Sequence, residues 1–278
     1  METPIPEERR QAILEQVNTR PLVKAAELSR TLGVSVESIR RDLIALEEEG
    51  LLRRVYGGAT RTTPRAFEPA FEKRRVQYRE RKLAIARLAA RLVEPGDTLI
   101  LDVGTSVEAV AHALPLTYRG KVLTNSLLVA TALAGRDGVE VFTSGGYVRG
   151  TEQACSGAAC EAFFRDFYAD KAFLGSGAVH HEAGLTDYWP DEVSVRRIII
   201  DHAAQTYVMA DSSKLGKVAV ARVCDLTGLT AVITDGEAEA DEVRLLEESG
   251  VTVMIAPLDD TSSPSETWEG RTDTASLS

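Results

Sequence analysis

The eight residues Leu99-Ile100-Leu101-Asp102-Val103-Gly104-Thr105-Ser106 decide the fold of the larger part of this chain. They begin with an apolar run of the length of a short buried strand, and they end in a glycine followed by two hydroxyl residues. Residues 107–114 continue with a helical pattern. A strand that passes through a glycine turn into a helix is the first half of a β-α-β unit, so this stretch predicts an α/β domain.

The alternation of strands and helices continues towards the C-terminus. Strands separated by helices pair in parallel, and the helices then cover both faces of the sheet. The sequence therefore predicts a doubly wound parallel sheet, preceded by a helix from Tyr78 to Leu92. The expected strands are residues 98–103, 121–124, 140–143, 171–174, 206–209, 230–234 and 251–255. The expected helices are residues 107–114, 127–134, 158–167, 192–203 and 240–248. The core positions expected in the preceding helix are Leu83, Ala86, Leu88, Ala89 and Leu92.

The first 60 residues carry a different pattern, in which short helices are separated by turns. Helices are expected over residues 7–18 and 24–32, and Gly33 stands where the second should stop. Ser35 is placed to cap a third helix. The apolar stripe of that helix consists of Ile39, Leu43 and Leu46. Two short helices joined by a tight turn and followed by a longer helix are typical of a helix-turn-helix, although a generic three-helix bundle has the same pattern.

The start of the third helix presents hydroxyl and arginine side chains if its apolar stripe faces the core. Hydroxyls reach phosphates and base edges, and arginines pair with guanine or phosphate. Residues 51–58 predict a strand, a basic stretch and a turn, which would form a wing against the DNA backbone or minor groove. In the alternative bundle, Arg40 and Arg41 merely face solvent. The expected DNA-binding residues are Lys24, Ser35, Val36, Glu37, Ser38, Arg40, Arg41, Arg53, Arg54 and Tyr56.

The net charge of −10 argues at first sight against nucleic acid, but the charge is unevenly placed. Residues 61–91 hold ten Lys or Arg and only three Asp or Glu. A basic segment on an acidic protein still binds DNA, because local phosphate contacts matter more than the total charge. A solvated linker and helix face explain the segment equally well. We expect residues 62–79 to be a linker and residues 258–278, rich in Ser, Thr and Asp, to be a disordered tail.

Loops of glycine and hydroxyl residues follow three of the expected strands. They are Gly104-Thr105-Ser106, Thr124-Asn125-Ser126 and Gly145-Gly146, the last after Ser144. At the carboxyl ends of parallel strands such loops present N–H groups and hydroxyls, and a helix N-terminus favours an anion. Lys214 follows another strand and adds a positive charge. Each loop alone is well explained as an ordinary turn and helix cap, but together with the lysine they predict a phosphorylated ligand.

Residues 8–59 closely resemble the DNA-binding domain of the DeoR family of bacterial transcriptional regulators. The matching strings are Leu32-Gly33-Val34-Ser35, Ile39-Arg40-Arg41-Asp42-Leu43, Leu46-Glu47 and Gly57-Gly58-Ala59. The resemblance continues from Arg81 to Asp235, through strings such as Leu101-Asp102-Val103-Gly104-Thr105-Ser106 and Asp211-Ser212-Ser213-Lys214. It implies a winged helix-turn-helix domain over residues 6–61. It also implies a sensor domain over residues 80–257, with a fold similar to that of ribose-5-phosphate isomerase.

The resemblance further implies that the sensor domain holds a pocket for a phosphorylated sugar or a similar metabolite. Three positions depart from the family pattern: Ser106 stands where Thr is frequent, Arg196 where Lys is frequent, and Leu215 where an aromatic residue is usual. Because Arg and Lys are not equivalent at a close contact, Arg196 is expected to alter how a ligand is held. The residues expected to bind the effector are Asp102, Gly104, Thr105, Ser106, Thr124, Asn125, Ser126, Gly145, Gly146, Arg149, Glu192, Arg196 and Lys214.

These features favour a repressor of a carbohydrate-metabolism operon, which a phosphorylated sugar releases from operator DNA. The alternative is a sugar-phosphate isomerase-like enzyme with a regulatory DNA-binding head, in which Asp102, Asp187 and Asp211 are candidate bases. No acid–base pair is identifiable, so we expect no catalytic residue and no cofactor. A homodimer or homotetramer is expected because a single winged module buries only a small interface on DNA.

The composition, 44% hydrophobic and 27% charged, is that of a globular protein. No apolar run approaches the ~20 residues of a membrane span, and the N-terminal residues lack the pattern of a secretory signal. Cys155, Cys160 and Cys224 form no Cys-x-x-Cys pair, and His180 and His181 have no identifiable partners. We therefore expect a cytoplasmic protein with neither a disulfide framework nor a metal site.

Overall fold

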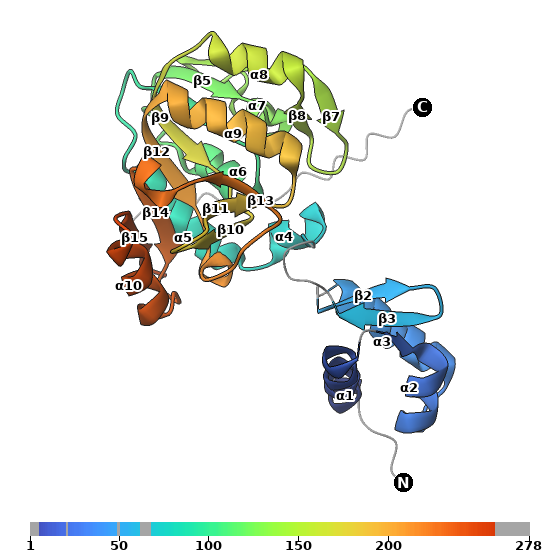
Figure 1. The fold of residues 1–278 in the computed structure, drawn as a ribbon. Coiled ribbons are helices and arrows are strands. Elements are labelled where there is room, and N and C mark those ends of the chain that lie inside the picture. The colour runs from blue at the N-terminus through green and yellow to red at the C-terminus, as the bar shows by residue number, and fades with distance from the viewer. Residues whose placement is uncertain (1–5, 21, 49–50, 62–67, 259–278) are drawn as a thin grey trace, which may run out of the picture.

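The computed structural model describes residues 6–20, 22–48, 51–61 and 68–258, which form a small N-terminal part and a larger α/β part (Figure 1). The N-terminal part contains three helices and a three-stranded antiparallel sheet of order β1-β3-β2. Its elements are α1 (Pro6–Thr19), β1 (Val23–Lys24), α2 (Ala25–Leu32), α3 (Val36–Glu48), β2 (Leu52–Val55) and β3 (Gly58–Arg61). The predicted helix-turn-helix and its wing are thus both present.

Local signals in the sequence set the turns of this part. Gly33 adopts the left-handed conformation, with φ of 65°, and its N–H bonds to the carbonyl of Ser29 at the end of α2. The hydroxyl of Ser35 accepts a hydrogen bond of 3.0 Å from the backbone N–H of Ser38, so it caps α3 as predicted. Gly58 lies against β1, where a Cβ atom would come within 2.1 Å of the carbonyl oxygen of Val23. Only glycine therefore lets β1 and β3 pair here.

The α/β part is built on a seven-stranded sheet of order β15-β14-β12-β9-β4-β5-β6. Every neighbouring pair in it runs parallel. All seven predicted strands are present in this sheet and no other strand joins it among the described residues, so the predicted doubly wound architecture is confirmed. The strands are β4 (Thr98–Leu101), β5 (Gly120–Thr124), β6 (Val139–Thr143), β9 (Ala169–Leu174), β12 (Ala203–Met209), β14 (Ala231–Asp235) and β15 (Thr252–Ala256).

Helices cover both faces of the sheet, because successive strand residues point to opposite sides. Leu99 and Leu101 of β4 belong to one core cluster, with residues of α5, α6 and α7. Ile100 belongs to a second cluster, with residues of α8, α9 and α10. The helices are α5 (Arg79–Ala90), α6 (Thr105–Ala113), α7 (Leu127–Leu133), α8 (Ala158–Arg165), α9 (Pro190–His202) and α10 (Ala240–Glu248).

Strand β4 is the point at which the strand order reverses. From β4 the chain passes outward to β5 and β6 on one side, and later through β9, β12, β14 and β15 on the other. In open α/β sheets, the carboxyl ends of the strands at such a switch point diverge and leave a crevice for a ligand. The loops after β4 and β9 are therefore the first place to look for a binding site.

Several short elements were not predicted from the sequence. They include α4 (Phe71–Val76), which lies within the segment expected to be a linker and buries Phe71. The face of α5 also differs from the prediction, since Lys82 and Ile85 are buried whereas Leu83 is half-exposed. The other added elements are β7 (Tyr147–Arg149), β8 (Ala154–Ser156), β10 (Ala178–His180), β11 (Gly184–Asp187), β13 (Ala221–Cys224), η2 (Ser212–Lys214) and η3 (Leu226–Gly228). The predicted tail was residues 258–278, and all of it except Leu258 lies outside the described residues.

Within the described part of the chain, no helix combines the length and the apolar character that crossing a bilayer requires.

Candidate functional site

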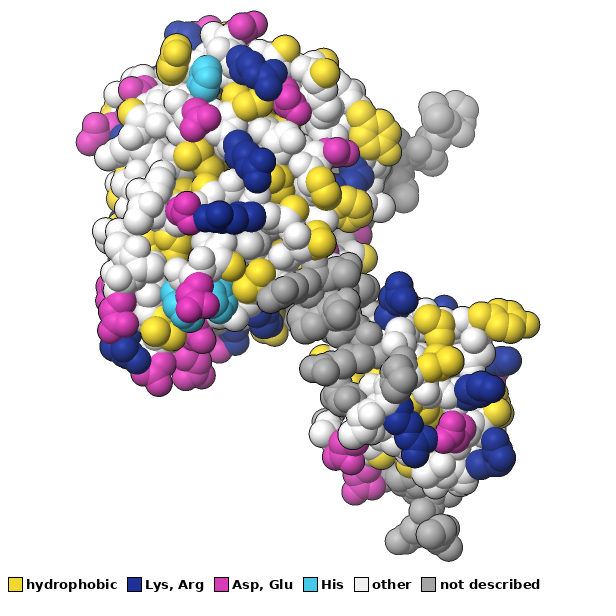
Figure 2. Space-filling model, viewed as in Figure 1, with side chains coloured by type: hydrophobic (Ala, Val, Ile, Leu, Met, Phe, Trp, Pro, Cys, Tyr) yellow, Lys and Arg dark blue, Asp and Glu magenta, His cyan; other side chains and the backbone are white. Residues whose placement is uncertain are grey.

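Most of the expected DNA-binding residues are exposed, and they lie on β1, at and after the start of α3, and on the β2–β3 hairpin. Figure 2 shows several of the basic side chains on the visible face of the N-terminal part. The Arg40 side chain is 66% exposed and forms only a loose pair, 3.4 Å, with Glu37. Arg54 pairs with Glu47 at 2.9 Å. The exposed members of the predicted set are Lys24, Ser35, Glu37, Arg40, Arg41, Arg53, Arg54 and Tyr56, and the half-buried ones are Val36 and Ser38.

Asp42 is buried, unlike the exposed Arg40 and Arg41 that precede it on α3. Its carboxylate is buried and accepts a hydrogen bond of 2.5 Å from Nε of Arg9 on α1, which raises the pKa of Arg9. The Arg40-Arg41-Asp42 string thus has two functions: the arginines face outward, and the aspartate ties α3 to α1. This internal tie was not predicted from the sequence.

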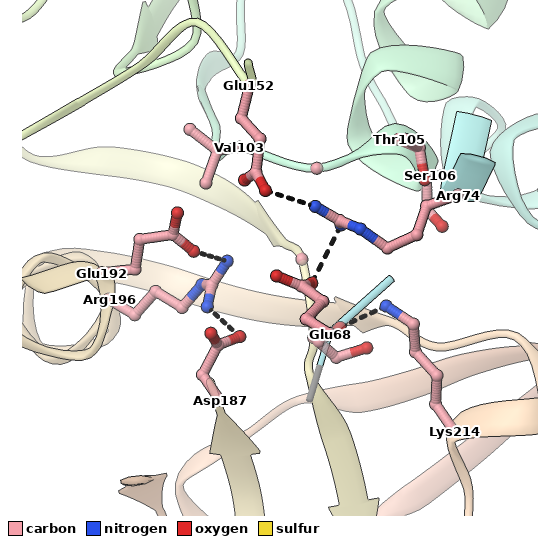
Figure 3. A pocket seen from close by; sticks show the side chains of 13 residues that line it. Glu68, Arg74, Val103, Thr105, Ser106, Glu152, Asp187, Glu192, Arg196 and Lys214 are labelled. Atoms are coloured by element: carbon pink, nitrogen blue, oxygen red, sulfur yellow. Dashed lines mark hydrogen bonds and ion pairs between the residues drawn. The ribbon is translucent and has the colours of Figure 1, made fainter. Parts of the chain in front are cut away.

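A pocket lies at the carboxyl ends of β4, β9 and β12, at the switch point of the sheet (Figure 3). Gly175, directly after β9, is required there because a Cβ atom would come within 2.3 Å of the carbonyl oxygen of Val103. The lining of the pocket combines a helix N-terminus, three cationic side chains and four carboxyl groups. The lining residues are Glu68, Arg74, Val103, Gly104, Thr105, Ser106, Glu152, Gly175, Ser176, Asp187, Glu192, Arg196 and Lys214.

Two of the cations, Arg74 and Lys214, line the pocket together with Thr105 and Ser106 at the N-terminus of α6. Arg74 pairs with Glu68 at 3.0 Å and with Glu152 at 2.6 Å. The Nζ of Lys214 donates a hydrogen bond to the carbonyl of Ser176. Burial lowers the pKa of Lys214, and the carboxylate of Asp211 opposes that shift. Orphan N–H groups of a helix N-terminus and two nearby cations form an arrangement that attracts a phosphate or another anion.

The third cation, Arg196, is buried among carboxylates. Its Nε lies 2.6 Å from Asp102, its Nη1 2.5 Å from Asp187 and its Nη2 3.2 Å from Glu192. Burial raises the pKa of Glu192 to about 8, against the opposing charge of Arg196. Burial also acts to raise the pKa of Asp187, but Arg196 and the N–H of Trp189 outweigh it and lower that pKa. Arg196 therefore organises one wall of the pocket, and Asp102 lies behind that wall.

Arg149 and Trp189 form the rim of the same wall. The Arg149 guanidinium lies 4.2 Å from the centroid of the Trp189 ring and pairs with Glu152 and Glu192. The Nε1 of Trp189 donates a hydrogen bond of 2.6 Å to Glu68. Burial raises the pKa of Glu68, and the charge of Arg74 opposes that shift. Glu68 is thus held by both Arg74 and Trp189.

The structure brings only part of the predicted effector set to this pocket. Gly104, Thr105, Ser106, Glu192, Arg196 and Lys214 line it. The lining includes neither Asp102 nor the predicted residues of the other two loops and the rim, which are Thr124, Asn125, Ser126, Gly145, Gly146 and Arg149.

The loop after β5 has a structural explanation. The Thr124 hydroxyl donates to the carbonyl of Leu101 at 2.6 Å, and the Ser126 hydroxyl caps α7 by accepting from Val129 N–H at 3.2 Å. The Asn125 amide lies 3.4 Å from the carbonyl of Cys155. In the third loop, Gly146 packs so that a Cβ atom would come within 2.3 Å of the carbonyl of Ser156. These residues shape the chain beside the pocket.

Several lining residues were not predicted, above all Glu68 and Arg74. Both lie in the basic segment of residues 61–91, which was interpreted as a linker or a DNA contact. The excess of positive charge in this segment could have indicated an anion-binding site, since Arg74 lines the pocket. Glu152 and Ser176 come from short loops that carry no motif.

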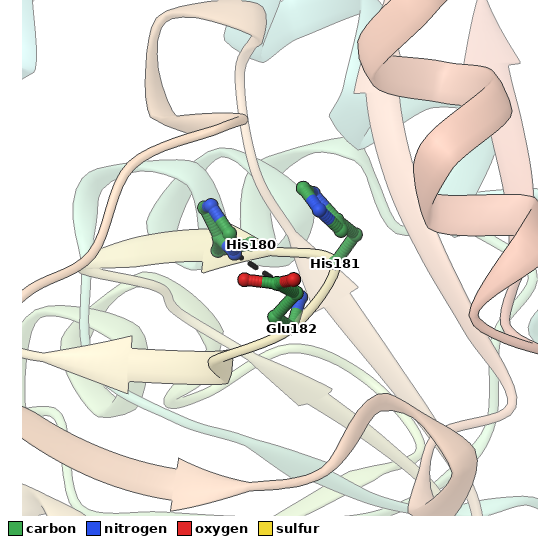
Figure 4. Close-up of side chains that lie close together, drawn as sticks. All are labelled: His180, His181 and Glu182. Atoms are coloured by element: carbon green, nitrogen blue, oxygen red, sulfur yellow. Dashed lines mark hydrogen bonds between the residues drawn. The ribbon is translucent and has the colours of Figure 1, made fainter.

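His180, His181 and Glu182 lie together, with possible ligand atoms within 4.8 Å of one another (Figure 4). They are consecutive residues at the end of β10, whose last residue is His180, and Nδ1 of His180 accepts the backbone N–H of Glu182 at 3.1 Å. The two imidazole rings stack at 4.3 Å. Their proximity follows from this turn, so we assign no metal to it. Cys155 and Cys160 are buried free thiols, and burial raises the pKa of both.

Comparison with known proteins identifies the class. The model of the DeoR-like helix-turn-helix domain matches residues 9–65, and that of the DeoR C terminal sensor domain matches residues 77–236. The chain therefore belongs to the DeoR family of DNA-binding transcriptional regulators. The expectation of a regulator rather than an enzyme is confirmed by this family and by the regulators and repressors among its relatives.

Two curated relatives cover almost the whole chain. The putative aga operon transcriptional repressor of Escherichia coli O157:H7 is 32% identical over 89% of this chain and 93% of its own length. The glycerol-3-phosphate regulon repressor of Escherichia coli (strain K12) is 30% identical over 89% of this chain and 98% of its own length. Ribose 5-phosphate isomerase A of Methanocaldococcus jannaschii aligns with 48% of this chain and 52% of its own at a TM-score of 0.36 and 17% identity, too low to carry an argument.

Proposed function

We propose that this regulator is a repressor of a carbohydrate-metabolism operon and that a phosphorylated sugar, bound in the switch-point pocket, releases it from operator DNA. The observation that carries the proposal is the meeting of Arg74, Lys214 and the N-terminus of α6 in one pocket. A phosphate group accepts hydrogen bonds on several oxygens, so it suits backbone N–H groups and cationic side chains together.

The opposite wall suits the sugar part of the ligand. Asp187 and Glu192 line the pocket and supply carboxyl oxygens, which accept hydrogen bonds from sugar hydroxyls. Arg196 holds both carboxylates in place. The name of one relative, the glycerol-3-phosphate regulon repressor, supports a small phosphorylated polyol as the chemical class.

DNA binding is assigned to the exposed face of α3 and to the hairpin. Arg40 and Arg41 would contact bases or phosphates, and Arg53, Arg54 and Tyr56 would lie against the backbone or minor groove. A homodimer or homotetramer is part of the proposal, because two winged modules reading two half-sites supply the interface that one lacks.

The test uses the full chain and an operator selected with it from a pool of random duplex DNA. Operator affinity is measured by fluorescence anisotropy with a panel of sugar phosphates and the matching unphosphorylated sugars. At least one sugar phosphate should weaken operator binding by about 5–150-fold, the usual range of allosteric coupling, and should raise the melting temperature of the protein. Release by an unphosphorylated sugar and by none of the phosphates would contradict the proposal.

A further inference from the structure

Glu68 occupies the cationic end of the pocket. It lies 3.0 Å from Arg74, and its other oxygen accepts the Nε1–H of Trp189 at 2.6 Å. The charge of Lys214 also acts on this carboxylate, and the charge of Glu68 acts in turn on Lys214. A carboxylate is thus seated among the groups proposed to hold the anionic part of the effector.

Glu68 also stands at a special place in the chain. In the sequence, only residues 62–67 separate it from Arg61, the last residue of β3 in the DNA-binding part. It lies three residues before Phe71, the first residue of α4, and Arg74 of that helix donates from Nε to the carbonyl of Pro69 at 3.0 Å. Arg74 therefore holds both the side chain of Glu68 and the backbone next to it. Lys82 in turn donates to the carbonyl of Arg74 at 2.9 Å, which fixes the end of α4.

We infer that Glu68 is a built-in competitor of the effector: it fills the anion site in the ligand-free regulator, and the phosphate of the effector displaces it. This inference rests on the proposed effector function of the pocket. Two anionic groups cannot share Arg74 and Lys214 without strong repulsion, because water is largely excluded there and screens them poorly. Displacement releases the side chain of Glu68, the first described residue after the DNA-binding part, so the loss of one ion pair links the pocket to operator affinity.

Two substitutions test separately whether Glu68 competes with phosphate and whether its contacts affect operator affinity. Glu68→Gln keeps the size of the side chain and an oxygen that accepts from Trp189, but it removes the competing charge. It should bind inorganic phosphate about 5-fold or more tightly than the wild-type chain, the lower end of typical coupling. Glu68→Ala also removes the contacts of residue 68 with Arg74 and Trp189, so its operator affinity without phosphate should fall towards that of phosphate-saturated wild type.

The matched control is Glu248→Gln. Glu248 is an exposed carboxylate that pairs with an arginine, Arg244, at 2.9 Å on α10, remote in sequence from the pocket lining. This variant loses the same charge as Glu68→Gln, so it should match the wild-type chain in both measurements. A gain in phosphate affinity with Glu68→Gln alone would then be specific to the pocket.

Tryptophan emission gives a direct readout of displacement. The chain has two tryptophans, Trp189 and Trp268, so Trp268→Phe leaves Trp189 as the single reporter. Adding inorganic phosphate should change the emission of Trp189 when Glu68 is present, because the indole loses its carboxylate partner. The change should be much smaller in the Glu68→Ala background.

The outcomes distinguish this inference from the proposed function. Equal phosphate affinity in wild type and Glu68→Gln, with weaker binding by Lys214→Ala, would overturn the competitor role and leave the effector site in place. Phosphate binding that neither Lys214→Ala nor Arg74→Ala weakens, or no phosphate binding by wild type and Glu68→Gln alike, would overturn both. The affinities are measured by isothermal titration calorimetry on the full chain.

Discussion

The Nε atom of Arg196 lies 2.6 Å from a carboxylate oxygen of Asp102, and the two side chains are only 3% and 0% exposed. The same guanidinium pairs with Asp187. Loss of the Arg196 guanidinium would leave the buried carboxylates of Asp102 and Asp187 without a counter-charge, which typically costs about 3–5 kcal/mol. We therefore expect Arg196→Ala to lower the free energy of unfolding by that amount at pH 7, as measured by urea denaturation followed by circular dichroism.

Two comparison variants sharpen this prediction. Arg196→Lys keeps the charge but loses the planar fork that reaches several carboxylates, so its loss of stability should be intermediate. Arg197, the next residue, is exposed and donates to the backbone carbonyl of Val223 at 3.0 Å. Arg197→Ala should cost no more than about 1.5 kcal/mol. An Arg196→Ala loss as small as that of Arg197→Ala would refute the structural role of the buried network.

Glu192 predicts a dependence of stability on pH. Burial raises its pKa in the folded protein to about 8, well above its ordinary value of 4.5. The folded state therefore holds a proton that the unfolded state has released between these two values. The contribution of this proton to the free energy of unfolding is fully present below pH 4.5 and is lost as the pH rises towards 8. The free energy of unfolding then falls by at most about 1.4 kcal/mol per pH unit.

Glu192→Gln removes this titration, because the amide stays neutral. Urea midpoints at pH 5, 6, 7 and 8 should fall with pH more steeply for wild type than for the variant. His112, whose pKa burial lowers, contributes a slope of opposite sign in this range, and the comparison with wild type cancels it. Identical pH profiles of the two proteins would mean that Glu192 is ionised in the folded state throughout.

The main sheet could be predicted from the sequence because its signals are local. Apolar strand runs, glycine turns and helical patterns each span no more than about fifteen residues. The antiparallel pairing of β11 with β13 could not be predicted in the same way, since it joins distant residues such as Leu185 and Cys224. The helix α4 was missed because its six residues are mostly charged, and only Phe71 and its tertiary contacts mark it as part of the fold.

Apart from Glu192 and Arg196, which the family resemblance supplied, the lining residues of the pocket were predicted only where the end of a single strand carried the signal. Gly104–Ser106 and Lys214 follow strands that end at the pocket, and both were found from their motifs. The similar loop at Thr124–Ser126 gave the same signal, but its hydroxyls are used for local bonds. Which loops converge depends on strand order, here β9 beside β4, and no local pattern encodes that order.

Operator binding should depend on Arg40 and Arg41. Both are exposed on α3, away from the buried Ile39 and Leu43. Arg40→Ala or Arg41→Ala should weaken operator affinity by about 1–3 kcal/mol per lost contact, without a change in melting temperature. Arg244→Ala, an exposed arginine of α10, serves as the control and should bind like wild type. If both α3 variants bind as tightly as that control, α3 is not the recognition helix.

Lys214 should couple the pocket to DNA release without contributing to operator binding itself. It lies in η2 at the carboxyl end of β12 and lines the pocket, whereas α3 carries the proposed DNA contacts. Lys214→Ala should therefore bind operator like wild type but resist release by the active sugar phosphate, which is the behaviour of a super-repressor. Because a ligand shifts an equilibrium only by its differential affinity, losing one phosphate contact raises the concentration needed for release. Lys121→Ala, at an exposed lysine of β5, should respond normally. Release of Lys214→Ala at the wild-type effector concentration would show that Lys214 does not contact the ligand.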